Sequence, residues 1–254
     1  MRQPRKRLLK EPSSVKAVIR DRWNIPERVD GWIHSDLNAE YADPGCRAAW
    51  KQALRDAAGE APPIEALDIG TGPGTIAQLW AELGYATTGV DISPAMVEAG
   101  RRLAKEKGLA IRFLEGDAEE PPFGRKRFGV ISSRFVLYTL PEPGYALRRW
   151  ASMLRPGGAL VLIGHDHAEG QGAAGHGRRR GHPHWADKKH PGVQCELPFM
   201  NHKSSDLRVV MQAAGLREIR SIDMKKLLAA RDKLRKTREA YAPRAMPFVL
   251  VGRR

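Results

Sequence analysis

The amino-acid sequence of 254 residues predicts an α/β fold, in which helices cover both faces of a doubly wound, mostly parallel sheet. Two observations predict it. Between 64 and 164, short continuous apolar runs alternate with helical stretches, as in a parallel sheet that is buried on both faces. A loop with three glycines follows the first of these runs, where such sheets bind nucleotides. Hydrophobic residues at 42% and charged residues at 28% are typical of a globular protein with a sizeable core.

Each expected element has its own signal. Runs rich in Ile, Val, Leu and Phe indicate strands, and apolar residues at helical spacing indicate helices. The expected strands are 64–69, 86–91, 110–114, 128–132, 159–164, 216–222 and 246–251. The expected helices are 15–22, 47–58, 75–83, 94–106, 143–154, 204–214 and a basic amphipathic helix at 224–241. The sequence Arg-Pro-Gly-Gly at 155–158 is expected to end a helix and turn the chain into the fifth strand.

We expect four parts along the chain. A helical N-terminal cap covers 1–60, and a cofactor-binding core covers 61–165. An insertion rich in His, Gly and Arg covers 166–203 and has no clear period. Loops of this length are uncommon unless they carry a function or are disordered. The C-terminal part of the core, with its basic helix, covers 204–254.

Composition excludes several classes of protein. No apolar run approaches the roughly 18 residues that a membrane span needs, and the basic start of the chain leads into no apolar signal stretch. Two cysteines, Cys46 and Cys195, form neither a disulfide framework nor a four-thiolate zinc site. A cytoplasmic protein is therefore expected.

The net charge of +14 lies wholly at the two ends of the chain. Residues 1–22 carry +6 and residues 217–254 carry +8, whereas the segment between them is neutral. A nucleic-acid enzyme needs basic side chains along the approach to its site, because neutralising phosphates supplies most of its binding energy. The location of the charge therefore lowers the case for an enzyme that acts on nucleic acid. The simpler interpretation is that Lys and Arg keep two exposed terminal helices soluble.

The strongest motif is the glycine loop after the first expected strand, within the sequence Ala-Leu-Asp-Ile-Gly-Thr-Gly-Pro-Gly-Thr at 66–75. Its glycines allow a tight turn and a close approach of the backbone to a ligand. Thr75 stands where a dinucleotide fingerprint needs its third glycine, which argues against NAD and FAD. Asp91 ends the second strand, where an acid accepts both hydroxyls of an adenosine ribose, and Asp117 follows the third strand.

With these motifs the sequence resembles the class I S-adenosylmethionine-dependent methyltransferases, in particular the small-molecule branch that includes enzymes of quinone biosynthesis. Five blocks carry the resemblance in the family's order, and they lie at 67–74, 89–96, 113–123, 133–141 and 154–158. The resemblance implies a Rossmann-like sheet of seven strands with the last strand antiparallel, and S-adenosyl-L-methionine as the cofactor. It fades after His165.

The resemblance also implies the cofactor-binding residues. The residues of the glycine loop would frame the methionine part of the cofactor. Asp91 would bind the ribose diol, with Ile92 against the adenine, and Asp117 would accept a hydrogen bond from the adenine amino group. The helix that begins near Thr75 would offer its free N–H groups to the methionine carboxylate. The full set is Asp68, Gly70, Thr71, Gly72, Gly74, Asp91, Ile92, Met96, Asp117, Ala118 and Ser133.

Transfer of a methyl group from a sulfonium mainly requires alignment of donor and acceptor and exclusion of water. A general base is needed only if the acceptor holds its proton at neutral pH. Arg134 and Tyr138 are our candidates to hold an anionic or phenolic acceptor, although an ion pair on the loop is the alternative for Arg134. His165 and His167, on one face of an extended segment, are the candidates for a base.

Two features stay open between a functional and a structural interpretation. Seven of the eight histidines fall between 165 and 202, and they would bind a transition metal, include a base, or belong to a solvated loop. We assign no metal ligand among them. The aromatic residues Trp23, Trp32, Tyr41 and Trp50 would either cover the site or form the core of the cap.

The predicted function is methyl transfer from S-adenosylmethionine to a small-molecule acceptor. An RNA methyltransferase that uses the basic termini is one alternative, and a protein that binds the cofactor without turnover is the other. The Asn-Pro-Pro-Tyr signature of enzymes that methylate amino groups of nucleic acids is absent after the fourth strand, where Ser-Ser-Arg-Phe stands at 132–135.

Overall fold

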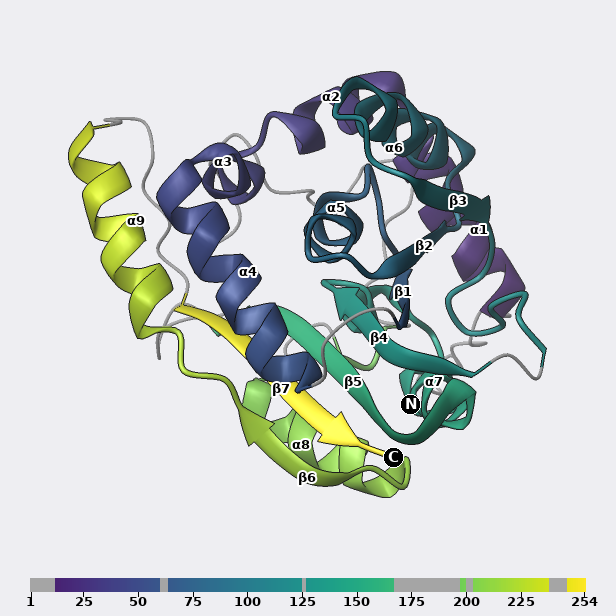
Figure 1. The fold of residues 1–254 in the computed structure, drawn as a ribbon. Helices are drawn as coiled ribbons and strands as arrows, with labels where there is room; N and C mark the ends of the chain where they lie inside the picture. The colour runs from purple at the N-terminus through teal and green to yellow at the C-terminus, as the bar shows by residue number, and fades with distance from the viewer. Residues whose placement is uncertain (1–11, 60–63, 125–126, 167–196, 200–202, 238–245) are drawn as a thin grey trace, which may run out of the picture.

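The computed structural model describes residues 12–59, 64–124, 127–166, 197–199, 203–237 and 246–254 (Figure 1). The helices are α1 (Pro12–Trp23), α2 (Pro26–Ile33), α3 (Asp36–Ala42), α4 (Pro44–Ala58), α5 (Thr75–Glu82), α6 (Pro94–Glu106), α7 (Pro143–Met153), α8 (Ser204–Ala213) and α9 (Lys225–Thr237), with a 3-10 turn η1 (Leu137–Thr139). The strands are β1 (Glu65–Ile69), β2 (Ala86–Asp91), β3 (Ile111–Glu115), β4 (Phe128–Arg134), β5 (Leu154–Asp166), β6 (Arg217–Ser221) and β7 (Met246–Arg253).

The strands form one sheet of seven in the order β3-β2-β1-β4-β5-β7-β6. The first five strands pair in parallel, and β7 runs antiparallel between β5 and β6. The predicted fold class is therefore confirmed, including the antiparallel last strand. The order reverses at β1, with β2 on one side and β4 on the other, which creates the switch point where ligands bind in sheets of this kind.

Alternation along the strands builds the two faces of the core. In β5, Val161 packs into one apolar cluster while Leu160 and Leu162 pack into the other, because successive side chains point to opposite faces of a sheet. The first cluster includes buried residues of α4, α5 and α9, and the second includes buried residues of α7 and α8 (Figure 1). The sheet is thus covered on both sides.

Four helices, α1 to α4, precede the sheet, and two of them were not predicted. Helices α2 and α3 have only eight and seven residues, too few turns for a clear apolar period. Helix α4 is better marked. Asp43 caps its start by accepting from the backbone N–H of Cys46 at 2.8 Å, and Gly59 ends it in the left-handed conformation.

The turn expected at 155–158 lies inside β5 instead of before it. Phe128 of β4 pairs with Leu154, and Val130 pairs with Ala159, so the chain of β5 bulges between these two registers. Gly157 adopts a φ of +75° in the bulge, and its N–H donates to the carbonyl of Arg254 at 3.1 Å. The Pro-Gly-Gly sequence therefore bends a strand that the last residues of the chain continue to pair.

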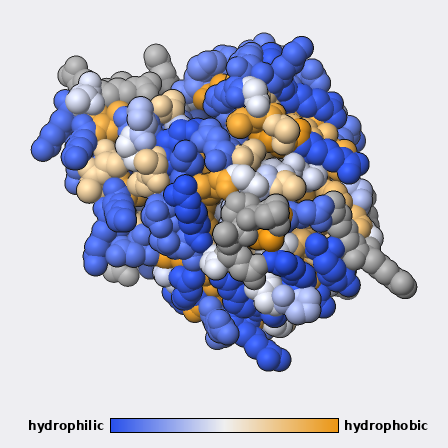
Figure 2. Space-filling view, in the orientation of Figure 1, coloured by the Kyte–Doolittle hydropathy of each residue, from blue (hydrophilic) through white to orange (hydrophobic). Residues whose placement is uncertain are grey.

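Most of the segment 166–203 lies outside the described residues, so its assignment as an insertion stays a prediction. None of the described helices is both long enough and apolar enough to cross a lipid bilayer. The face of the molecule in Figure 2 is mostly hydrophilic, with apolar residues in small groups. The large apolar side chains that are exposed lie on different elements, as with Val209 on α8 and Met246 at the start of β7.

Candidate functional site

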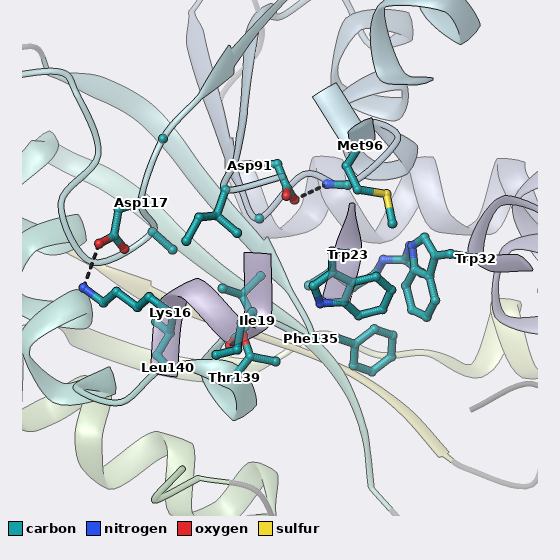
Figure 3. A pocket seen from close by; sticks show the side chains of 17 residues that line it. Lys16, Ile19, Trp23, Trp32, Asp91, Met96, Asp117, Phe135, Thr139 and Leu140 are labelled. Carbon is teal, nitrogen blue, oxygen red and sulfur yellow. Dashed lines mark hydrogen bonds and ion pairs between the residues drawn. The ribbon is translucent and has the colours of Figure 1, made fainter. Parts of the chain in front are cut away.

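A pocket lies at the carboxyl ends of β1, β2, β3 and β4, where the order of the strands reverses (Figure 3). The open space among its lining residues amounts to about 770 Å³, with the solvent at its mouth included. The sheet and its loops line one side, and α1 and α2 line the other. The lining residues are Lys16, Ile19, Trp23, Trp32, Gly70, Gly72, Asp91, Ile92, Met96, Gly116, Asp117, Ala118, Arg134, Phe135, Val136, Thr139 and Leu140.

Two glycines of the loop reach the pocket, for different reasons. Gly70 has a φ of +65°, and a Cβ there would lie 2.0 Å from Cγ2 of Val136, so packing alone excludes a side chain. Gly72 has a φ of +53°, and the nearest atom to its missing Cβ is Nε1 of Trp32 at 3.6 Å. The backbone at Gly72 is therefore open toward the pocket, whereas Gly70 brings the loop close to Val136.

Asp68 lies behind the glycine loop and not in the lining. Its two carboxylate oxygens accept from the hydroxyls of Ser132 and Thr71, each at 2.7 Å. Burial raises the pKa of Asp68 to about 6, and these two hydrogen bonds oppose the rise. The Ser133 hydroxyl likewise donates inward, to the carbonyl of Ile69 at 2.9 Å. Asp68, Thr71 and Ser133 thus hold the ends of β1 and β4 together under the site.

Asp91, the last residue of β2, is the acid that lines the middle of the pocket. Its Oδ2 accepts from the N–H of Gly72 at 2.8 Å, and its Oδ1 accepts from the N–H of Ser93 at 2.9 Å. Burial raises the pKa of Asp91 to about 6 against the effect of these bonds. A carboxylate has about four acceptor positions, so Asp91 can accept two further hydroxyls from a ligand.

Asp117 lies at one end of the pocket beside a cation that the sequence analysis did not single out (Figure 3). Lys16 of α1 donates to Oδ2 of Asp117 at 2.7 Å and also pairs with the buried Glu119. Lys16, Ile19 and Trp23 all line the pocket and are spaced i, i+3 and i+7, which is one face of a helix. That spacing was visible in the sequence, but nothing in it showed what the face covers.

Of the four aromatic residues of the cap, two cover the site and two belong to the core of the cap. Trp23 and Trp32 line the pocket with their rings edge to face at a centroid distance of 5.6 Å. Tyr41 and Trp50 instead stack on each other at 5.1 Å inside the core, and both are buried. The first pair covers the site and the second pair supports the cap beneath it.

The four candidates for catalysis also divide. Arg134 lines the pocket, whereas His165 and Tyr138 do not belong to its lining, and His167 lies outside the described residues. His165 lies behind Phe135, with the two rings 5.1 Å apart, and its Nε2 is 3.2 Å from Nη2 of Arg231. Because a guanidinium can only donate, His165 accepts through Nε2 in this arrangement.

Tyr138 follows β4 in the turn η1, with its hydroxyl buried. Among the described residues this hydroxyl has no hydrogen-bond partner. Burial raises the pKa of Tyr138 above its usual value, and the charge of Asp166 adds to the rise. Within the part of the chain that the structure describes, no three residues of His, Cys, Asp or Glu are grouped as metal ligands. The histidines between 167 and 190, together with His202, lie outside that part.

Comparison with known proteins agrees with this geometry. Residues 67–162 match the family described as "Methyltransferase domain". The chain is 34% identical over 130 residues to a demethylmenaquinone methyltransferase of Thermus thermophilus, a match that covers 50% of this chain and 59% of that protein. It is 30% identical over 132 residues to the demethylmenaquinone methyltransferase of Renibacterium salmoninarum, which covers 52% and 54%. The chain thus matches little more than half the length of these relatives.

Among solved structures, the fold is similar to a phosphoethanolamine N-methyltransferase of Haemonchus contortus in complex with S-adenosyl-L-methionine. The TM-score is 0.64 at 16% identity, over 92% of this chain and 59% of the other. At that identity the likeness concerns the fold alone. Residues 67–162 are therefore similar to a family of methyltransferase domains, within a fold that solved methyltransferases share.

Proposed function

We propose that this chain binds S-adenosylmethionine in the pocket and catalyses transfer of its methyl group to a small-molecule acceptor. The observation that carries the proposal is the position of Asp91. Its carboxylate ends β2, lines the pocket and is fixed by the N–H of Gly72 in the loop after β1. A vicinal diol that enters there meets two acceptor oxygens whose positions are already fixed.

The residues on either side of Asp91 fit the rest of an adenosine. Ile92 and Ala118 present apolar surface to the pocket, which suits the faces of a flat base, whereas Met96 lies near Gly72 and Trp32 at the other end (Figure 3). Asp117 stands beyond them, with Oδ1 bound to the N–H of Glu119 at 2.8 Å, and can accept from an exocyclic amine. In this proposal Asp68, Thr71, Gly74 and Ser133 act from behind, by shaping the loop.

The cofactor, when bound, supplies a methyl group on a positively charged sulfur. The chain's own residues orient it and exclude water. Trp23 and Trp32 cover the pocket from α1 and α2, and Phe135 lines it beside Trp32 and Arg134. An in-line displacement needs this alignment more than it needs a proton acceptor.

The proposal for the acceptor draws on the relatives and not on the pocket. The relatives with sequence similarity are named for methylation of demethylmenaquinone, a small molecule, and a small acceptor is carried over from them to this chain as a proposal. Tyr138, in the turn η1 after β4, stays our candidate to hold the acceptor. His165, behind Phe135, stays our candidate for a base, as does His167 outside the described residues. A cytoplasmic location also stays a prediction.

Binding of the reaction product tests the donor site directly. Isothermal titration of the protein with S-adenosylhomocysteine should show binding, and Asp91→Ala should weaken it by about 1–3 kcal/mol through loss of charge-assisted hydrogen bonds. Glu98→Ala is the matched control, because Glu98 is an exposed acid on the neighbouring helix α6. Wild-type protein that takes up no S-adenosylhomocysteine would refute the proposal.

Turnover tests the acceptor class. Formation of S-adenosylhomocysteine is measured with a nucleic-acid-free metabolite extract and, separately, with total RNA. We expect product with the metabolites alone. Product with RNA alone, together with a steep loss of activity as salt rises, would instead favour the RNA methyltransferase. Binding without product from either source would favour a protein that only binds the cofactor.

A further inference from the structure

Arg134 is a buried cation that lines the pocket. It is the last residue of β4 and is only 9% exposed. The next residue, Phe135, has a φ of +62°, an unfavourable left-handed conformation that turns the chain sharply away from the strand. Around the guanidinium stand three aromatic rings, with centroids 5.0 Å (Tyr41), 5.5 Å (Trp32) and 5.5 Å (Phe135) from Cζ. These rings hold the group in place through their faces.

The partners of Arg134 do not neutralise its charge. Nη2 donates to Oδ1 of Asn38 at 2.8 Å, and the Tyr41 hydroxyl lies close to the guanidinium. Burial raises the pKa of Tyr41, so this partner also stays neutral. Within the described parts of the chain, no carboxylate forms an ion pair with Arg134. The charge of Arg134 lowers the pKa of Asp68, but the hydrogen bonds that Asp68 accepts come from Ser132, Thr71 and the N–H of Ala77 and not from Arg134.

The second buried arginine of this region, in contrast, forms an ion pair with a carboxylate. Arg231 makes two short contacts with the carboxylate of Glu40. A buried charge without such a counterion is costly, and a guanidinium has five donors in a fork that matches a carboxylate. Glu40 forms an ion pair with Arg231, whereas no acid among the described residues forms one with Arg134. A ligand bound in the pocket can supply the anion.

The location of Arg134 indicates which part of a ligand supplies that anion. Oδ1 of Asn38 accepts from Arg134 and, at 3.3 Å, from the hydroxyl of Thr75, the first residue of α5. Gly74 provides no side-chain cap to this helix. The N–H of Ala77 donates to Asp68, so the N–H groups of Thr75 and Ile76 are those that a ligand could reach. Arg134 and the start of α5 therefore flank one place, and both favour negative charge.

That place belongs to the glycine-loop end of the pocket. Figure 3 shows Asp117 at one end, Asp91 between, and Trp32 with Phe135 at the other end. Trp32 and Phe135 are the rings that enclose the Arg134 guanidinium. A donor with its adenosine on Asp117 and Asp91 extends its amino-acid end toward Arg134.

We propose that Arg134 binds the carboxylate of the donor's amino-acid moiety, with Asn38 as a positioning residue. This inference rests on the proposed function. It gives Arg134 a role in binding the donor in place of the acceptor contact that the sequence suggested. The carboxylate receives charge-assisted hydrogen bonds from the guanidinium and the positive end of α5.

The test compares two ligands that differ only in the carboxylate. S-Adenosylhomocysteine and its decarboxylated analogue share the adenosine, the thioether and the ammonium group. Titrations of wild-type protein and Arg134→Gln with both ligands form a cycle between the side chain and the ligand's carboxylate. We expect the substitution to weaken S-adenosylhomocysteine binding by about 10–100-fold and to change binding of the analogue by less than about threefold.

Two further variants complete the design. Arg102→Gln, at an exposed arginine of α6, should leave both affinities unchanged. Arg134→Lys keeps the charge but loses the fork, and it should restore part of the selectivity for the carboxylate. It also provides a folded comparison if the glutamine variant is unstable, because thermal unfolding is recorded for each.

The outcomes separate the possibilities. Equal losses for both ligands would mean that Arg134 only shapes the pocket, and would overturn the proposal. No loss for either ligand, with a raised KM for the acceptor, would assign the anion to the acceptor and would also overturn it. Wild-type protein that binds neither ligand would refute the donor site itself, which is a distinct result from selectivity that does not depend on Arg134.

Discussion

The pair between Arg231 and Glu40 connects the C-terminal helix α9 to the N-terminal helix α3. Nε of Arg231 lies 2.5 Å from Oε2 of Glu40, and Nη2 lies 2.9 Å from Oε1. The two side chains are 4% and 2% exposed. Because neither group has access to water, the pair is a sensitive place to test what holds the cap on the sheet.

Glu40→Gln removes the negative charge at nearly constant volume and leaves the cation of Arg231 buried. Breaking a buried pair in this way typically costs about 3–5 kcal/mol. For a chain of this size each kcal/mol corresponds to about 2–4 °C in the unfolding temperature, so we expect a fall of roughly 10 °C. Replacing both groups together, as Glu40→Leu with Arg231→Met, should recover most of the loss, since apolar residues of similar size tolerate burial.

The assay is thermal and urea unfolding at pH 7 of the wild type, the single variants Glu40→Leu, Glu40→Gln and Arg231→Met, and the double variant. Arg235→Met on the same helix is the control, because its pair with Asp232 is exposed and should contribute under about 0.5 kcal/mol. Two results would refute the reasoning. One is a Glu40→Gln variant no less stable than the control. The other is a double variant whose loss equals the sum of the losses of Glu40→Leu and Arg231→Met, which would mean no coupling.

Three shorter predictions follow from the site. Burial raises the pKa of Asp91 to about 6, so Asp91 becomes protonated as the pH falls through that value. Protonation should weaken S-adenosylhomocysteine binding by up to about tenfold for each pH unit below the pKa. Titrations from pH 5 to 8 should show this loss in the wild type and not in Asp91→Asn. Gly70→Ala should lower the free energy of unfolding by roughly 2–5 kcal/mol, because the residue has a positive φ and its new Cβ clashes with Val136. A second substitution, Val136→Ala, should recover only the part of the loss that comes from the clash. Urea unfolding measures both variants, and full recovery would contradict the argument from φ. Lys16→Met should cost about 1–3 kcal/mol by unpairing the buried Glu119, and an unchanged unfolding midpoint would show that this pair contributes nothing.

The sequence by itself determined the class of fold and pointed to two acids that line the pocket. Strands buried on both faces are read as continuous apolar runs, and Asp91 and Asp117 follow such runs at positions that backbone geometry brings to one edge. Gly72 could be recognised for the same reason, because the loop that joins β1 to α5 is local. Local periodicity and spacing suffice where the partners are close along the chain.

The tertiary structure alone decided what covers the site. Lys16 meets Asp117 across 101 positions of sequence, and Arg134 meets Asn38 across 96. Sequence reasoning left Arg134 between an acceptor contact and a loop ion pair, because its surroundings of aromatic rings and a neutral amide come from α2, α3 and the turn after β4. Whether a buried cation has a counterion depends on which distant side chains reach it in three dimensions. No spacing along a single chain encodes that, so the electrostatics of the pocket emerge only when the cap is packed on the sheet.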